Sequence, residues 1–440
     1  MHLSNKIYTI REYDAFTRGS AFSGYKGLPE KTFDALEAFI LANNTNNGAD
    51  AIELLALSAR RGVGKIITAR NYVGLITMAD GTVIEILPKI TSGEISDTET
   101  KKIFLEMLKT LRDVSFKNFN VSHLHTDRLS LLEIFIKMFL DEVTILTKQG
   151  LKAAYTPVEA NEHFYKGKLI ASQNIKYNLV NKERFFTRYD EFSINRPENR
   201  LIKSTLKLLL KATGDGRNRQ NSSRLLTFFE GAEYSASADT DFSKCFLDRS
   251  MNHYDKVLSW CRVFLCGNSF TAFAGSEVAL ALLFPMEKIF ESFVAAKFRK
   301  HITNGVNIWT QDARYSLFDL PRKSFGLRPD IVLSDDNETI VIDTKWKVLS
   351  ENIRNYGIAQ SDMYQMYAYG KKYAAKKIIV LYPQVEKMRE DNIFFQSDDG
   401  VTVEVAFIDL RLPDISIAAL AKWDDGMLKE SVSDREYSFF

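Results

Sequence analysis

Cysteine and histidine are scarce in this chain of 440 residues, which has three cysteines and six histidines. Cys245, Cys261 and Cys266 form no C-x-x-C pair and have no histidine pair nearby, so a structural zinc site is not expected. The histidines show no H-E-x-x-H or related spacing, which disfavours a histidine-based metal nuclease. We interpret the cysteines as buried thiols in a reducing cytoplasm.

Long apolar runs and a strong charge of one sign are also missing. No stretch reaches the ~18 apolar residues of a membrane span, and the N-terminal residues carry charges where a signal peptide needs an apolar run. We therefore expect a cytoplasmic protein without membrane association. Lys and Arg number 58 against 56 Asp and Glu, giving a formal net charge of +2. Because the chain has no overall basic character, any DNA contact must use local patches or a partner.

A nucleotide-binding phosphate loop is absent as well. The segment from Gly62 to Ile66, GVGKI, contains glycines and a lysine. It lacks the G-x-x-x-x-G-K-[ST] spacing, and no hydroxyl residue follows Lys65 to reach a magnesium ion. We therefore expect that this chain does not hydrolyse nucleotides itself.

The length and the 45% hydrophobic content predict a globular protein of two or three domains. Residues 1–150 are expected to form a β-rich and helical region, residues 151–270 a middle region of strands and helices, and residues 271–440 an α/β domain. The fold class is thus a mixture of α/β and α+β domains.

The N-terminal region shows both strand and helix patterns. Residues 65–90 alternate apolar and polar positions around Asp80-Gly81, a dipeptide typical of a tight hairpin turn. Segments 101–115 and 129–148 repeat apolar residues at helical spacing and predict amphipathic helices.

The middle region contains basic residues interleaved with aromatic ones, at 166–168 and 184–188. Such a pattern can contact phosphates, but it is also typical of a solvated strand pair, which is the interpretation we favour. From Asn199 the pattern becomes helical. The stretch GDGRNRQNSS from Gly214 is predicted to be a loop.

The C-terminal region has alternating helix and strand patterns that predict a mixed sheet flanked by helices. Pro285 suits the first turn of a helix. The predicted elements are a helix from Phe284, an extended segment over 306–319, a hairpin over 327–347, a helix over 361–375 and a buried strand over 376–383.

The predicted hairpin brings two acidic residues together. With Asp336-Asn337 as its two turn residues, 333 pairs with 340 and 331 with 342, and Asp330 then falls opposite Asp343. Cross-strand neighbours have Cβ atoms about 4.5–5.5 Å apart, and like charges at such positions are destabilising. A divalent cation between the carboxylates removes the repulsion. A turn displaced by one residue would break this pairing, and the two tripeptides R-P-D and D-x-K also occur by chance in loops and surface ion pairs.

Side-chain alternation separates the two faces of this hairpin. Ile331, Leu333, Ile340 and Ile342 share one face, which we expect to be core, whereas Asp330, Asp343 and Lys345 share the other together with two valines. We expect this second face to be solvent-facing and to hold the site. Lys345 is then placed to orient or deprotonate a water molecule and to stabilise charge on a phosphate.

The C-terminal region resembles the PD-(D/E)XK nuclease superfamily. Pro329-Asp330 and Asp343-Thr344-Lys345 match its two signature elements, and Gln365 and Tyr369 match a Gln-x-x-x-Tyr motif on the following helix. Upstream, Glu291 matches the acidic residue of the first helix, although a solvated helix glutamate is the alternative. The resemblance implies that Asp330, Asp343, Glu291 and Thr344 hold Mg²⁺, with Mn²⁺ as a possible substitute. Lys345, Gln365 and Tyr369 would complete the catalytic set.

Over about residues 55–385 the chain is similar to the McrC family, the nuclease subunits of McrBC-type restriction systems. The similarity is carried by ARNYVGLITMADGTVIEILPKI, RFFTRYDEFSINRPENRLIK and FPMEKIFESFV as well as by the nuclease motifs. It implies a Mg²⁺-dependent endonuclease that cuts double-stranded DNA in a GTP-dependent response to modified cytosine. It also implies that the N-terminal region docks on an oligomeric McrB-like AAA+ GTPase and stimulates its GTP hydrolysis.

Two other functions are compatible with the same residues. One is a stand-alone repair nuclease or exonuclease that has this site but no motor. The other is an adaptor that kept the fold and lost cutting, against which the intact acid, acid and lysine positions argue.

Overall fold

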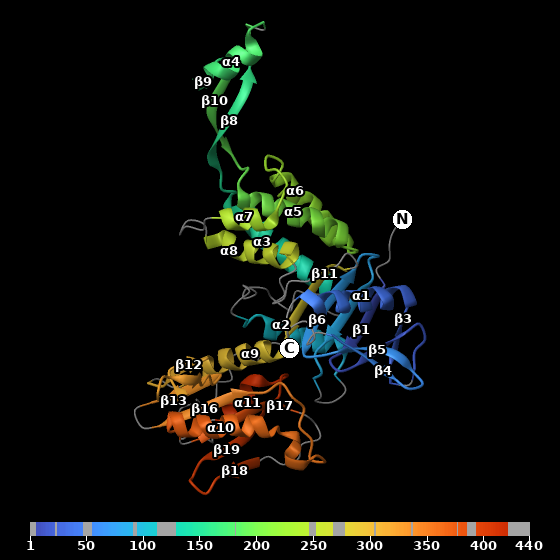
Figure 1. Ribbon diagram of the computed structural model, residues 1–440, viewed down its shortest axis with the longest axis vertical. Coiled ribbons are helices and arrows are strands. Elements are labelled where there is room, and N and C mark those ends of the chain that lie inside the picture. The colour runs from blue at the N-terminus through green and yellow to red at the C-terminus, as the bar shows by residue number, and fades with distance from the viewer. Residues whose placement is uncertain are drawn as a thin grey trace, which may run out of the picture. The chain divides into compact units, whose positions relative to one another are not determined.

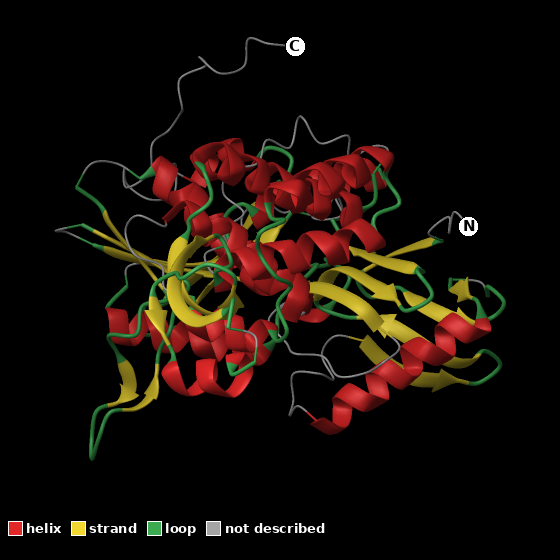
Figure 2. Cartoon of the chain, turned by 90° about the horizontal axis from the view of Figure 1, so that it is seen from above, coloured by secondary structure: helices red, strands yellow, loops and turns green. Residues whose placement is uncertain are grey.

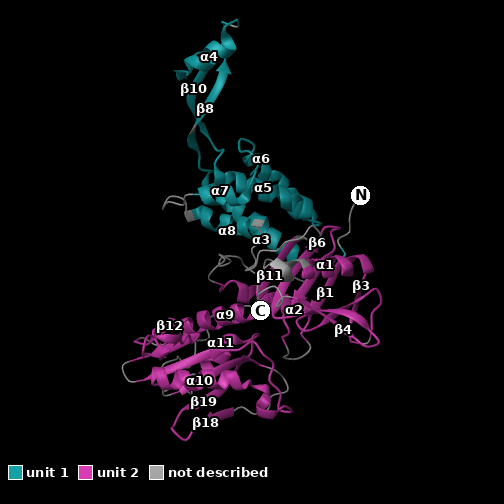
Figure 3. Ribbon diagram, in the orientation of Figure 1, with its two compact units in different colours: residues 1–6, 129–273 teal, residues 7–128, 274–440 magenta. Residues whose placement is uncertain are grey.

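The protein is described by a computed structural model that covers residues 6–22, 24–46, 55–90, 95–111, 129–180, 182–245, 252–266, 278–302, 305–335, 338–375, 377–384 and 393–420. The chain forms two compact units, which Figure 3 shows in two colours. Unit 1 comprises Met1–Lys6 and Leu129–Phe273, and unit 2 comprises Ile7–Arg128 and Ala274–Phe440. These two units differ from the three consecutive regions expected from the sequence, because Ile7–Arg128 and Ala274–Phe440 form one unit.

Unit 1 is built mainly from packed helices. The helix predicted over 129–148 is α3 (Leu131–Gln149), which contacts α6 and α8. Buried aromatic rings fill the core, for example Phe139 with Phe264 at 5.7 Å between centroids. The other helices of the bundle are α5 (Pro197–Ala212), α6 (Gly216–Phe228), α7 (Ala238–Lys244) and α8 (Asn252–Cys266).

The helix α6 corrects the prediction of a loop from Gly214. Asp215 caps this helix by accepting a hydrogen bond from the backbone N–H of Asn218. The carboxylate of Glu133 on α3 also accepts from the backbone N–H groups of Gly214 and Asp215. The polar composition of GDGRNRQNSS suggested a loop, but tertiary capping from α3 outweighs that local preference.

The strand pair predicted in the middle region is confirmed. β8 (Ala154–Glu162) and β10 (Phe185–Ser193) are antiparallel, with the short β9 (Lys168–Leu169) on the other side of β10 and α4 (Ala171–Asn178) between β9 and β10 in the chain. Many side chains of this segment are exposed, among them Tyr155 and Phe192.

The N-terminal part of unit 2 contains two four-stranded sheets. The first has the order β1 (Ile7–Arg11), β7 (Val83–Leu87), β6 (Tyr72–Met78), β11 (Val278–Pro285). The second has the order β3 (Lys26–Leu28), β2 (Ala15–Arg18), β5 (Gly64–Ala69), β4 (Leu55–Arg60). Two helices accompany them, α1 (Glu30–Asn46) and α2 (Asp97–Leu108). The hairpin predicted around Asp80-Gly81 is the β6–β7 pair.

β11 joins the C-terminal residues to the N-terminal sheet by pairing with β6. At Gly74 on β6, φ is +135°, and a Cβ there would lie 2.0 Å from the carbonyl oxygen of Leu282. Only glycine permits this close approach of the two strands.

The C-terminal part of unit 2 contains the mixed sheet that the sequence predicts (Figure 1). Figure 2 shows the helices and strands of the chain in separate colours. Its order is β12 (Asn307–Thr310), β15 (Ile331–Ser334), β16 (Thr339–Thr344), β17 (Lys377–Pro383), β19 (Thr402–Ile408), β18 (Ile393–Gln396). The strands β16, β17 and β19 are parallel and the others antiparallel.

Helices α9 (Met286–His301) and α10 (Gln360–Tyr373) both contact β16, and α11 (Pro413–Leu420) contacts α9 and β19. A small hairpin, β13 (Ser316–Phe318) with β14 (Ser324–Gly326), separates β12 from β15, and a short 3₁₀ helix spans Arg354–Gly357. Among the described residues, no helix has the length and apolar character needed to cross a membrane.

Candidate active site

The register predicted for the acidic hairpin is confirmed. Ile331 pairs with Ile342 and Leu333 with Ile340 on the antiparallel strands β15 and β16. The two turn residues Asp336 and Asn337 lie outside the described residues. This register places Asp330 directly before β15 and Asp343 near the end of β16, so that both carboxylates come to the same end of the strand pair.

Asp330 is held by three hydrogen bonds. Its Oδ2 accepts from the backbone N–H and the hydroxyl of Thr344, at 2.8 and 2.7 Å. Its Oδ1 accepts from Nε2 of Gln311 at 3.1 Å. These donors fix the carboxylate beside Asp343, the neighbour of Thr344 in the chain.

Gln311 is a site residue that sequence reasoning missed. Its Nε2 also donates to Oε1 of Glu291 at 2.7 Å, so a single amide joins Glu291 of α9 to Asp330. Gln311 follows β12 with φ +53°, an uncommon conformation for a residue other than glycine. No motif marks Gln311; the one signal in the sequence was its place within the extended segment predicted over 306–319.

Lys345, Gln365 and Tyr369 form a continuous polar chain that begins at Asp343. The Nζ of Lys345 lies 2.7 Å from Oδ2 of Asp343 and donates to Oε1 of Gln365 at 3.3 Å. Nε2 of Gln365 in turn donates to the hydroxyl of Tyr369 at 2.7 Å. The i,i+4 spacing on α10 thus brings Gln365 and Tyr369 to the same place as the acid pair and the lysine.

The face that carries these residues is buried, which corrects the prediction that it is solvent-facing. Val332 and Val341 are 0% exposed, Asp343 is 2% exposed, and both valines belong to a core cluster with Met366 and Tyr369 of α10. The isoleucines and the leucine of the opposite face are buried too. The central strands of an α/β sheet are covered on both sides, so the site lies at the rim of a helix-covered face.

Burial and mutual repulsion control the charges of the two acids. Burial raises the pKa of Asp330 above its ordinary value. Burial, and next the negative charge of Asp330, raise the pKa of Asp343 to about 7. Burial alone would lower the pKa of Lys345, but its attraction to Asp343 outweighs this effect and the pKa is raised. The lysine therefore stays charged, and the acid pair favours a further cation or a proton.

The donor atoms fit a hard divalent cation with few protein ligands. Within the described part of the chain, no three His, Cys, Asp or Glu side chains gather closely enough to bind a metal by themselves. Asp330 and Asp343 supply two adjacent carboxylates, and Glu291 reaches Asp330 only through Gln311. The N–H and hydroxyl of Thr344 donate to Asp330, so Thr344 holds this carboxylate in place beside Asp343. Mg²⁺ is commonly bound by one or two carboxylates while it keeps several waters.

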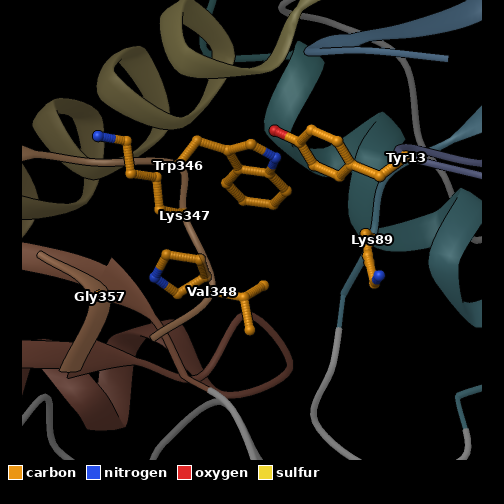
Figure 4. Close-up of a pocket in the computed structure, with 7 residues that line it drawn as sticks. Tyr13, Lys89, Trp346, Lys347, Val348 and Gly357 are labelled. Carbon is orange, nitrogen blue, oxygen red and sulfur yellow. The ribbon is translucent and has the colours of Figure 1, made fainter. Parts of the chain in front are cut away.

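A cavity of about 330 Å³ is lined in part by Trp346, the residue that follows Lys345 in the sequence (Figure 4). It is lined by residues of both parts of unit 2: Tyr13, Lys89, Trp346, Lys347, Val348, Gly357 and Pro383. The indole Nε1 of Trp346 donates to both carboxylate oxygens of Glu12, at 3.2 and 2.9 Å. Glu12 is fully buried, and this burial raises its pKa to about 7. The residue that follows Lys345 is thereby attached to the N-terminal part of the unit.

The fold defines a mixed α/β protein. Its polar site, with an acid pair on adjacent strands, lies at the end of the sheet. A model of the family described as McrBC 5-methylcytosine restriction system component matches residues 67–383, well over half of the chain. The chain therefore belongs to this family, which confirms the family predicted from the sequence. No curated protein sequence matches the chain.

Solved structures that are similar to the chain include two assemblies from one organism. One is a half-complex from a tetradecameric assembly of Thermococcus gammatolerans McrB AAA+ hexamers with bound McrC. Its matching chain has 17% sequence identity and a TM-score of 0.66, over 92% of this chain and 95% of that one. The other is the McrBC complex of the same organism, with 20% identity and a TM-score of 0.48 over 66% of this chain and 86% of that one. The first match shows that most of the chain shares the fold of that solved structure.

Proposed function

We propose that this chain is the DNA endonuclease subunit of a McrBC-type restriction system. The observation that carries the proposal is the pair of adjacent carboxylates, half-buried Asp330 and buried Asp343, with the ammonium group of Lys345 at 2.7 Å from Asp343. A charge arrangement of this kind is costly unless a cation or a reaction requires it. Membership in a family of restriction components supports DNA as the substrate.

In this proposal Asp330 and Asp343 hold Mg²⁺, or Mn²⁺ in its place. A bound ion would polarise the phosphate and would lower the pKa of a water molecule. The hydrogen bonds from Thr344 and Gln311 keep Asp330 oriented toward the site. Lys345 stays protonated beside Asp343, so its role is to orient the attacking water and to stabilise the negative charge that develops on the phosphate.

Gln365 and Tyr369 position Lys345. The amide oxygen of Gln365 accepts from Lys345 while its amide nitrogen is held by the buried hydroxyl of Tyr369. Tyr369 is 1% exposed, and burial raises its pKa, so the hydroxyl keeps its proton. Glu291 acts on Asp330 through Gln311 or, when the substrate is bound, on the ion itself.

The partner in this proposal is an oligomeric McrB-like AAA+ GTPase. The similar half-complex holds McrB AAA+ hexamers with bound McrC, and the present chain lacks the phosphate-loop spacing that nucleotide hydrolysis needs. The partner would supply the GTP-driven motion, and this chain would supply cutting and stimulate GTP hydrolysis. Recognition of modified cytosine follows the description of the family, and a cytoplasmic location follows from DNA as the target.

The test is a cleavage assay with the full-length chain and a McrB-like AAA+ GTPase from the same source. We expect cutting of DNA that contains 5-methylcytosine, with GTP and Mg²⁺ or Mn²⁺, and no cutting with Ca²⁺, which demands a less strict geometry. Asp399→Asn is a matched control, because Asp399 is an aspartate of the same sheet region that pairs with Lys371 outside the site. Cutting without GTP and without the partner would instead favour the stand-alone nuclease.

A further inference from the structure

The segment between β12 and β15 contains a hairpin whose apolar side chains are exposed. Phe318 is 55% exposed, Phe325 74% and Leu320 86%. Monomeric proteins expose single apolar residues commonly, but a group of large ones within eight residues marks an interaction surface. We call residues 316–326, with β13 and β14, the β13–β14 arm.

The base of this arm is anchored firmly to α10. The rings of Tyr315 and Tyr373 are in edge contact, with centroids 4.7 Å apart. The Nζ of Lys372 donates to Oδ2 of Asp319 at 2.8 Å, and β13 contacts α10 directly. The arm therefore has a defined position on the helix that also carries Gln365 and Tyr369 (Figure 1).

Both ends of the same segment lie in the candidate active site. Gln311, before the arm, bonds to Glu291 and Asp330. After the arm, the backbone of Arg328 bonds to the hydroxyl of Tyr369, and Asp330 follows two residues later. A substrate that reaches the two carboxylates thus passes next to the arm.

The segment is basic although the chain as a whole is nearly neutral. Residues 312–328 contain four basic and two acidic side chains, a net charge of +2 that equals the formal net charge of all 440 residues. Both acids are already paired, Asp312 with Arg314 and Asp319 with Lys372. Arg322, Lys323 and Arg328 are exposed and form no ion pair within the described residues.

We propose that the β13–β14 arm binds duplex DNA beside the bond that is cut. Arg322, Lys323 and Arg328 contact backbone phosphates, which accounts for three exposed basic side chains that form no ion pair within the described residues. Leu320 and Phe325 pack against sugars and base edges in the minor groove, where apolar side chains are commonly inserted. DNA fits the arm better than a protein partner does, because the exposed cations surround the apolar tip and the segment leads into the acid pair. The inference rests on the proposed nuclease function and adds a substrate-binding surface to it.

The first experiment measures binding of a fluorescent duplex to the full-length chain reconstituted with its GTPase partner, in Ca²⁺ so that cutting does not occur. For the double variant R322Q/K323Q we expect affinity to fall about tenfold and the slope of log K against log[salt] to decrease by about 2, because each lost phosphate contact contributes about 0.9. The control is K211Q/R217Q, which removes two exposed charges from α5 and α6 of unit 1, outside both the N-terminal region and the sheet that carries the acid pair. Equal affinity and equal slope in R322Q/K323Q and the control would overturn the proposal.

The second experiment identifies what the apolar tip touches. The photoreactive residue p-benzoylphenylalanine is placed at position 325 of the full-length chain, in the same complex on the same duplex. Crosslinks to DNA are expected; crosslinks only to a protein chain, or none, would contradict the proposal. The proposed function is tested separately, because Asp343→Asn should lose cutting while it keeps the arm's DNA binding. If Asp343→Asn cut normally, the nuclease assignment would be wrong whatever the arm does.

Discussion

Two buried carboxylate sites in this protein differ in how their charge is satisfied. In unit 1, Glu133 accepts from the hydroxyl of Thr213, from Nδ2 of Asn218 and from two backbone N–H groups. In unit 2, Asp343 has a second carboxylate and one ammonium group as its neighbours. Glu133 accepts hydrogen bonds from neutral donors and thereby holds the segment around Gly214 in place. Asp343 is instead repelled by the neighbouring carboxylate of Asp330. Burial alone therefore does not mark a catalytic acid; the unsatisfied repulsion does.

Replacing Lys345 by methionine should have the largest effect on activity. The change removes the cation that pairs with Asp343 but approximately keeps the length of the side chain. We expect DNA cleavage to fall by about 10²–10⁴-fold, the usual contribution of a positioned proton-transfer or charge-stabilising group, with partner binding unchanged. Single-turnover cleavage rates measure the loss. A rate within threefold of wild type would remove Lys345 from the mechanism.

Replacing Glu133 by alanine should show the opposite behaviour. Four donors lose their acceptor, and each unsatisfied buried donor costs about 1–3 kcal/mol, so we expect unit 1 to lose roughly 2–4 kcal/mol of stability, since water can satisfy some donors. The Asp343→Asn variant, which relieves repulsion in a metal-free protein, should lose no stability. Urea unfolding of both variants checks the contrast. If Asp343→Asn were as destabilised as Glu133→Ala, the acid pair would be structural.

Glu12 is an intermediate case that can be tested by pH. Burial raises its pKa from 4.5 to about 7, so the folded protein prefers the protonated acid. The stability linked to Glu12 is present below pH 4.5 and is lost as pH rises from there through about 7. The loss amounts to at most about 3 kcal/mol. Relative to wild type, Glu12→Gln should gain stability between pH 5 and pH 8; an unchanged difference across that range would show that Glu12 does not titrate there.

Replacing Gln365 by alanine should have the smallest effect. Lys345 keeps its ion pair with Asp343 but loses the amide that restrains its direction. We expect about a tenfold lower cleavage rate, equivalent to about 1.4 kcal/mol, with an unchanged Mg²⁺ requirement. Gln365→Glu is the companion variant, because it keeps an oxygen acceptor for Lys345. If alanine and glutamate gave the same rate as wild type, Gln365 would have no positioning role.

The acid pair could be located from the sequence because it depends on short-range rules. Turn chemistry and strand alternation determine which residues pair, so Ile331 opposite Ile342 follows from the chain alone. The burial of the same face could not be seen, because it results from packing by α10, more than 15 residues further along. Gln311 was missed for a similar reason, since its two partners lie 20 and 19 residues away.

The grouping of the chain was also beyond the reach of local patterns. β11 begins the predicted third domain but pairs with β6, and Trp346 bonds to Glu12 across 334 residues. A fragment of residues 271–440 would lack both partners. The division of labour between partner docking and cutting is therefore better tested by point variants in the whole chain than by truncation at residue 270.

The central claim is that Asp330 and Asp343 form a metal-dependent DNA-cutting site. The most direct measurement is single-turnover cleavage of methylated DNA by the complex with the GTPase, over a Mg²⁺ titration, for wild type, Asp330→Asn, Asp343→Asn and Asp399→Asn. We predict saturable Mg²⁺-dependent cutting for wild type and Asp399→Asn. Both site variants should fall by at least about 10³-fold at every Mg²⁺ concentration while GTP hydrolysis continues. Wild-type cutting by Asp343→Asn, or cutting by the wild-type complex in excess chelator, would contradict the account.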